Sequence, residues 1–147
     1  LKYGGRKDIG EVMGRFMATE LALTDFFCGI DVILPVPLHP RKQRMRGYNQ
    51  SEYIARGISS VTGILVDTSS VTRKRHTETQ TRKSAYERWE NVNGIFWLRY
   101  PDRFTGRHIL IVDDVLTTGA TITACADTFQ GINGIQISIL TLAVADA

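Results

Sequence analysis

Hydrophobic residues recur with the period of a helix in several parts of the chain. From Asp8 to Phe27 they fall three or four positions apart, which predicts an amphipathic helix with one hydrophobic face. That face consists of Ile9, Val12, Met13, Phe16, Met17 and Leu21. A second helix is expected between Asn49 and Gly63, because Asn49 with Glu52 matches a capping box and Gly63 is a C-terminal stop.

Short aliphatic runs bounded by turn residues predict the strands. These runs are Asp31–Val36, Ile64–Val71, Gly94–Leu98, His108–Val112 and Ile135–Val144. A third helix is expected over Thr121–Phe129, and Ile135–Val144 is expected to be a buried final strand. Because continuous aliphatic strands alternate with helices, the sequence predicts an α/β fold with a mainly parallel sheet flanked by helices.

Basic residues are concentrated in two segments, although the net charge of the chain is only +3. Arg41–Arg46 reads RKQRMR and Arg73–Arg75 reads RKR, and such clusters indicate anionic ligands. The second cluster begins an almost wholly polar stretch, Arg73–Asn93. A polar stretch of about twenty residues inside a compact domain predicts a functional loop or flap, with a disordered hairpin as the alternative.

The composition is that of one globular domain, with 147 residues, 43% hydrophobic and 22% charged. No run approaches the roughly 18 apolar residues that span a membrane, and we expect a cytoplasmic protein. Cys28 and Cys125 lie in apolar surroundings without the spacing of metal ligands, and we expect two buried thiols. The chain starts at Leu1 without a methionine, so we expect one domain over residues 1–147 that lacks an N-terminal segment.

The stretch HILIVDDVLTTGAT places two acids and a hydroxyl-rich loop directly after a buried strand. Ligands of open α/β sheets bind at the carboxyl ends of strands, where we expect Asp113 and Asp114. The following turn leads into a helix, so its N–H groups and the helix dipole can hold an anion. The residues expected to form this cradle are Leu116, Thr117, Thr118, Gly119, Ala120 and Thr121. Acids suited to a vicinal diol beside a phosphate cradle indicate a sugar phosphate site; the alternative is an acid that ends a strand and a threonine that caps a helix.

IVDDVLTTGAT closely resembles the phosphoribosyl diphosphate (PRPP) signature of type I phosphoribosyltransferases. The resemblance implies that Asp113 and Asp114 bind the ribose hydroxyls. It also implies that the loop from Leu116 to Thr121 binds the 5-phosphate. The fold that it implies is the type I phosphoribosyltransferase-like α/β fold with a flexible flap.

A narrower resemblance covers nearly the whole chain, which is similar to the ComF/GntX branch of this family, bacterial proteins often associated with DNA uptake. It rests on an RxRGYNQ element and a TxxQ…ERxxNV element. Their residues are Arg44, Arg46, Gly47, Tyr48, Asn49, Gln50, Thr77, Gln80, Glu87, Arg88, Asn91 and Val92. Members commonly carry a four-cysteine zinc ribbon before the first helix, and this sequence lacks those cysteines. Either the ribbon was cut away or this member has none.

The resemblance also gives roles to the two basic segments. The segment after the first strand corresponds to the diphosphate loop, for which a solvated basic turn is the alternative. Its predicted ligands are Pro37, Leu38, Arg41, Lys42, Arg44 and Arg46. Arg73–Asn93 corresponds to the flap that closes over PRPP and excludes water. The predicted catalytic residues are Asp113, Asp114, Arg73, Arg75 and Arg88.

The predicted reaction transfers a phosphoribosyl group from PRPP to a nitrogen acceptor and releases diphosphate. Mg²⁺ is expected as cofactor, bound mainly through the substrate and not at a protein metal site. No residue identifies the acceptor base or amine. The rival function is a non-catalytic PRPP- or nucleotide-binding accessory in DNA uptake, whose basic flap contacts single-stranded DNA. A second copy of the chain, in a homodimer, is a further expected partner.

Overall fold

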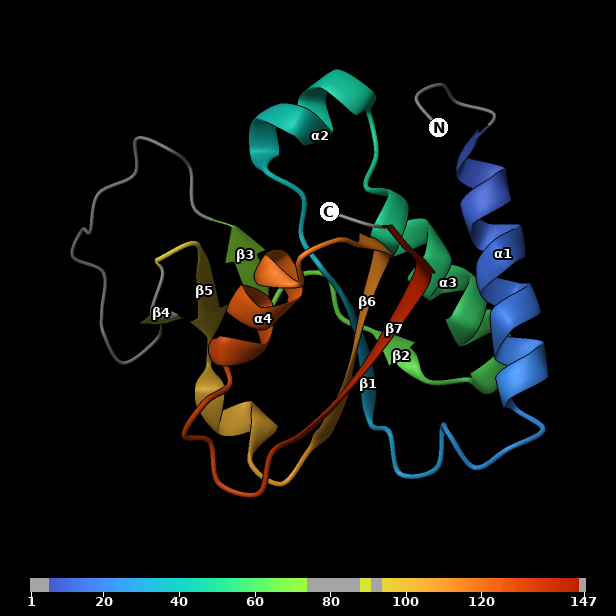
Figure 1. The fold of residues 1–147 in the computed structure, drawn as a ribbon. Helices are drawn as coiled ribbons and strands as arrows, with labels where there is room; N and C mark the ends of the chain where they lie inside the picture. Colours follow the sequence, from blue (N-terminus) through green and yellow to red (C-terminus); the bar gives the residue numbers. More distant parts are fainter. Residues whose placement is uncertain (1–5, 74–87, 91–93, 146–147) are drawn as a thin grey trace.

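A four-stranded parallel sheet forms the centre of the fold (Figure 1). The computed structural model describes residues 6–73, 88–90 and 94–145. The spatial order of the strands is β2-β1-β6-β7, and each neighbouring pair is parallel. Their bounds are β1 Val32–Pro35, β2 Leu65–Val66, β6 His108–Leu116 and β7 Gln136–Val144. The prediction of an α/β fold around a mainly parallel sheet is thus confirmed.

A second, antiparallel sheet has the order β3-β5-β4. Its strands are β3 Val71–Arg73, β4 Arg88–Glu90 and β5 Phe96–Arg99. The single strand predicted over Ile64–Val71 was wrong, because β2 and β3 belong to different sheets. Asp67 Oδ1 accepts hydrogen bonds at 2.9 Å from the N–H groups of both Ser69 and Ser70. This side-chain turn ends the first strand before the second begins.

Helices flank the parallel sheet, and a 3-10 helix, Pro101–Phe104, follows β5. Their bounds are α1 Arg6–Leu21, α2 Pro40–Arg46, α3 Gln50–Thr62 and α4 Ala120–Asp127. The start and end predicted for α3 are confirmed, because Asn49 accepts from the Ser51 N–H and Gly63 follows with a φ of 78°. α2 lies in the segment predicted to be a diphosphate loop, and the helix itself was not predicted, since seven residues are too few to show a hydrophobic period.

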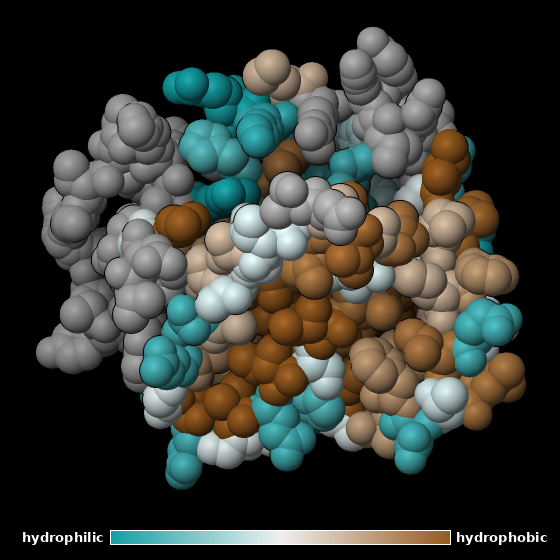
Figure 2. Space-filling view, viewed as in Figure 1, coloured by the Kyte–Doolittle hydropathy of each residue, from teal (hydrophilic) through white to brown (hydrophobic). Residues whose placement is uncertain are grey.

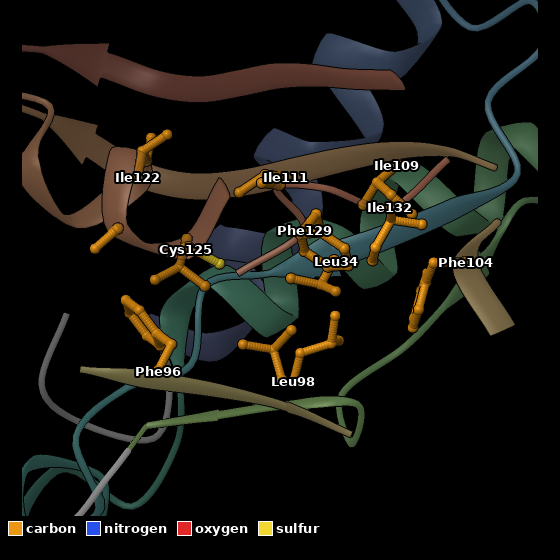
Figure 3. Close-up of a cluster of buried hydrophobic side chains, with 13 residues drawn as sticks. Leu34, Phe96, Leu98, Phe104, Ile109, Ile111, Ile122, Cys125, Phe129 and Ile132 are labelled. Atoms are coloured by element: carbon orange, nitrogen blue, oxygen red, sulfur yellow. The ribbon is translucent and has the colours of Figure 1, made fainter. Parts of the chain in front are cut away.

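The parallel sheet has a hydrophobic cluster on each face because side chains alternate along its strands. Ile109 and Ile111 of β6 lie in the cluster with α4 and the antiparallel sheet (Figure 3). Leu110 and Val112 lie in the other cluster, with Ile54 and other residues of α3. Burial on both faces explains why the strand appears in the sequence as a continuous aliphatic run.

α1 packs against α3 through its small residues. A Cβ atom on Gly14 would lie 2.2 Å from the carbonyl oxygen of Ile54. A Cβ atom on Gly57 of α3 would lie 2.2 Å from the carbonyl oxygen of Glu11. Ala18 of α1 is fully buried. The two backbones can approach this closely only because both positions are glycine.

The hydrophobic face predicted for α1 is consequently exposed along most of its length. Ile9, Val12 and Phe16 expose 50, 49 and 60% of their surface. The helical period was predicted correctly, but most of the hydrophobic face is exposed because the small residues of α1 are the ones that pack against α3. α1 also ends at Leu21, earlier than predicted.

β7 is an edge strand of the sheet in the described part of the chain and is only partly covered. Hydrophobic surface gathers on the front of the molecule, where Figure 1 places β7 (Figure 2). The side chains of Ile139 and Val144 on this strand are exposed. The strand was therefore predicted in the right place but wrongly expected to be buried. Cys125 is buried as expected, whereas the expectation for Cys28 was wrong because it is exposed.

Candidate functional site

The two acids lie inside a strand and not after it. β6 continues through Asp113 and Asp114 to Leu116 and pairs with β7 to its end. Its pairing with β1 stops at Val112. The acids therefore occupy the part of β6 that extends beyond β1 at the carboxyl end of the sheet. This is the predicted location in space, reached by a longer strand than predicted.

Asp113 accepts two hydrogen bonds from residues that the structure describes. Its Oδ1 accepts from the Ser51 hydroxyl at 2.9 Å and from the Asp114 N–H at 2.9 Å. Burial raises the pKa of Asp113 to about 6, while both hydrogen bonds oppose this change by stabilising the charged form. A carboxyl group that titrates this close to neutral pH is typical of functional sites.

A cavity of about 230 Å³ lies beside the two acids. Its walls come from the loop after β1, from α2, from the start of α3, and from β3, β6 and α4. Besides the acids, the predicted site residues that line it are Pro37, Leu38, Lys42, Arg73 and Thr121. The structure thus brings parts of the predicted ribose, diphosphate and flap segments to one place.

Arg73 reaches this cavity from the antiparallel sheet. Its Nη1 atom donates to the carbonyl oxygen of Pro37 at 3.4 Å, and its guanidinium carbon lies 5.3 Å from the ring centroid of Phe96. Burial lowers the pKa of Arg73, and the charge of Asp113 opposes this change. Arginine stays protonated in proteins, so Arg73 supplies positive charge beside the acids.

A smaller cavity of about 40 Å³ lies along the predicted phosphate cradle. Leu116, Thr117, Gly119, Ala120 and Thr121 line it together with Asp113. Gly119 precedes α4 with a φ of 86°, a conformation that favours glycine. The first N–H groups of a helix lack partners within the helix, and the helix dipole favours negative charge there. The loop can therefore hold a small anion.

Thr118 has a structural contact in this loop. Its hydroxyl oxygen accepts from the Ala120 N–H at 3.2 Å, and Thr118 does not line either cavity. Arg41 and Arg44 of the predicted diphosphate set are exposed on α2 and are also absent from the cavity lining. Hydrophilic surface covers this helix at the top of the molecule (Figure 2).

The remaining predicted residues fall wholly or partly outside the described part of the chain. Arg75 lies outside the described residues, as does most of the predicted flap. The backbone of Arg88 is placed in β4, opposite Arg99 of β5. Arg46 ends α2. The side chains of Arg46 and Arg88 are outside what the structure describes.

Sequence reasoning missed Asn49, Gln50 and Ser51 as residues of the cavity wall. Asn49 accepts from the Ser51 N–H and donates through Nδ2 to the carbonyl oxygen of Val36 at 3.1 Å. The sequence identified Asn49 as a helix cap. The further signal was its position, because a helix that starts shortly after a parallel strand begins at the ligand-binding edge of the sheet.

Two properties of the described residues bear on metals and membranes. No three of their His, Cys, Asp and Glu side chains form a group that could hold a metal ion. None of the helices they form has both the length and the hydropathy needed to cross a bilayer.

Comparison with known proteins finds similar sequences in bacteria. The DNA utilization protein YhgH of Escherichia coli K12 is 36% identical over 129 residues, 86% of this chain and 56% of that protein. Competence protein F of Haemophilus influenzae is 34% identical over 110 residues, 73% of this chain and 48% of that protein. The chain thus spans about half the length of the curated relatives that it matches. No family model matches it.

Comparison with solved structures finds the same fold in phosphoribosyltransferases. Adenine phosphoribosyltransferase from Saccharomyces cerevisiae has a TM-score of 0.58 at 12% identity, covering 91% of this chain and 66% of that one. Purine phosphoribosyltransferase from Pyrococcus horikoshii has a TM-score of 0.52 at 16% identity, covering 92% of this chain and 73% of that one. These likenesses show the fold.

Proposed function

We propose that this chain, which is similar to the YhgH and competence F proteins and has the fold of type I phosphoribosyltransferases, belongs to the ComF family and binds PRPP beside Asp113 and Asp114. The observation that carries this proposal is the convergence of two acids, a helix-start cradle and two cations on adjoining cavities. Asp113 and Asp114 would accept hydrogen bonds from the ribose hydroxyls. The loop that ends at Thr121 would bind the 5-phosphate.

Arg73 and Lys42 would bind the diphosphate end of the same ligand. Both line the larger cavity and approach it from different elements, β3 and α2. Two cations placed around a leaving diphosphate stabilise the negative charge that develops as its bond to the sugar breaks. The proposed reaction is therefore phosphoribosyl transfer from PRPP to a nitrogen acceptor.

Mg²⁺ suits this chemistry because a diphosphate itself supplies the hard oxygen ligands that the ion prefers. The two acids of the cavity are assigned to the ribose hydroxyls, so the substrate oxygens would hold the ion. The bound ion would neutralise charge on the leaving group. A screen of nucleobases and amines for diphosphate release from PRPP tests turnover and identifies the acceptor.

Replacing Asp114 with asparagine should weaken binding of ribose 5-phosphate at least about tenfold, the usual cost of losing a hydrogen bond to a charged group. The amide oxygen of the new side chain can still accept the 2.8 Å hydrogen bond that Asp114 Oδ1 accepts from Val115 N–H, so the melting temperature should hold. Titration calorimetry of wild type, Asp114→Asn and the exposed control Asp102→Asn measures the effect. Equal affinities in all three would refute the sugar assignment.

The names of the relatives favour a second candidate, a non-catalytic accessory of DNA uptake that contacts single-stranded DNA. Arg73→Ala separates the two functions. Its control is Arg107→Ala, because Arg107 is exposed and precedes β6 at the end of the strand away from the two acids. We expect Arg73→Ala to weaken PRPP–Mg²⁺ binding and to leave oligonucleotide binding unchanged. A DNA contact predicts the reverse: oligonucleotide affinity that falls steeply with salt, with a shallower slope in Arg73→Ala. Fluorescence anisotropy across a salt series distinguishes these results.

A further inference from the structure

We propose that Ser51 is a positioning residue that holds Asp113 in the orientation needed to bind a ribose hydroxyl. The inference rests on the proposed function, because it concerns the acid assigned to the sugar. It goes further by making the first turn of α3 part of the sugar site.

A chain of three hydrogen bonds links the end of β1 to Asp113. Asn49 Nδ2 donates to the Val36 carbonyl oxygen at 3.1 Å, and Asn49 Oδ1 accepts from the Ser51 N–H at 3.1 Å. The Ser51 hydroxyl then donates to Asp113 Oδ1 at 2.9 Å. Asn49 and Ser51 are 8 and 3% exposed. Buried side chains held at both ends have little freedom to turn, so Ser51 presents its hydroxyl from a fixed place.

Both hydrogen bonds that Asp113 makes with the described residues go to the same oxygen. Ser51 and the Asp114 N–H each donate to Oδ1, so the carboxyl group is fixed on that side. Oδ2 is then the oxygen that can accept from a ribose hydroxyl in the cavity. Without the Ser51 hydroxyl, the carboxyl group keeps one anchor and can rotate away from the ligand.

Among the described residues, the charged and titratable groups around Asp113 come from four elements. Asp114 is its neighbour on β6, Arg73 comes from β3, Lys42 from α2 and Cys125 from α4. Burial raises the pKa of the Cys125 thiol to about 12, so it is neutral at physiological pH. The Ser51 hydroxyl and the Asp114 N–H favour the charged carboxylate, whereas the Asp114 side chain disfavours it. The positive charge of Arg73 and the negative charge of Asp113 stabilise each other.

The test is an NMR titration of the Asp113 carboxyl carbon in ligand-free protein. The midpoint should lie near pH 6 in wild type and rise by about one to two pH units in Ser51→Ala, the value of one hydrogen bond to the charged form. Ser51→Thr keeps the hydroxyl and should restore the wild-type midpoint. Ser60→Ala is the matched control, because this serine of α3 bonds instead to the Gly57 carbonyl oxygen. A Ser51→Ala midpoint equal to that of wild type would overturn the proposal.

Binding of ribose 5-phosphate to the same variants completes the test. At pH 8, Ser51→Ala should bind about three- to tenfold more weakly than wild type and Ser60→Ala, while inorganic phosphate binding stays the same. A shifted midpoint with unchanged ribose 5-phosphate affinity would also overturn the proposed positioning role. If wild type itself binds no ribose 5-phosphate, the proposed function fails, and the titration alone still shows whether Ser51 holds Asp113.

Discussion

Replacing Asp113 with asparagine should stabilise the folded protein at neutral pH and abolish ribose 5-phosphate binding. Burial raises the pKa of Asp113 to about 6, above its ordinary value of 3.8. The folded state therefore holds this proton more tightly than the unfolded state does. The stabilisation from the neutral carboxyl is complete below about pH 4 and is lost as pH rises through 6. At pH 7 the half-buried carboxyl of Asp113 is charged in the wild type, at a cost in stability. The neutral amide of the variant avoids this cost.

The gain should be on the order of 1–2 kcal/mol in the free energy of unfolding at pH 7, after allowance for solvent screening. Urea denaturation at pH 4 and pH 7 measures it, and the difference between Asp113→Asn and wild type should nearly vanish at pH 4. Asp25→Asn, an exposed acid in the turn after α1, is the control. An Asp113→Asn protein that is no more stable than wild type at pH 7 would show that the charge is not costly there.

Replacing Gly14 with alanine should destabilise the protein by about 3 kcal/mol or more. The new Cβ atom would lie 2.2 Å from the carbonyl oxygen of Ile54 and 3.0 Å from its carbonyl carbon. Both atoms belong to the backbone of α3, so no side chain can rotate to make room. α1 would have to move away from α3 along its length, which opens the packing around Ala18.

Gly10→Ala on the same helix is the matched control. Its Cβ atom would meet the Tyr53 Cβ atom at 3.4 Å, an ordinary contact. Alanine favours a helix over glycine by up to about 1 kcal/mol, so this variant should be neutral or slightly more stable. Urea denaturation of the two variants compares them directly. Similar free energies of unfolding would contradict the close approach of the two helices.

The strand that carries the acids and the helix that follows it could be predicted because each has a local signal. The run before Asp113 is aliphatic at every position, since both faces of β6 are covered. Gly119 marks the start of α4, because only a glycine readily adopts its φ. These signals depend on neighbouring residues alone, and they placed the acids on β6 and the glycine loop before α4.

The errors concern features that depend on distant residues. The exposed face of α1 follows from glycines on two helices, and a hydrophobic period cannot show which face a partner will cover. The length of β6 follows from pairing with β7, which hydrogen-bonds the backbone at Asp113 whatever its side chain. Ser51 lies 62 positions from Asp113 in the chain, so no local pattern could join them.

The different exposure of the two cysteines allows thiol labelling to measure local opening of the domain at α4. Cys28 is exposed, so a thiol reagent reaches it in the native state. Cys125 is buried in α4, close along the chain to the predicted phosphate cradle, and should react only when that helix separates from the sheet. The labelling rate of Cys125 therefore reports how often α4 opens, and the labelling rate of Cys28 is the internal reference. A ligand bound at Thr121 should lower the labelling rate of Cys125, although it does not contact the thiol.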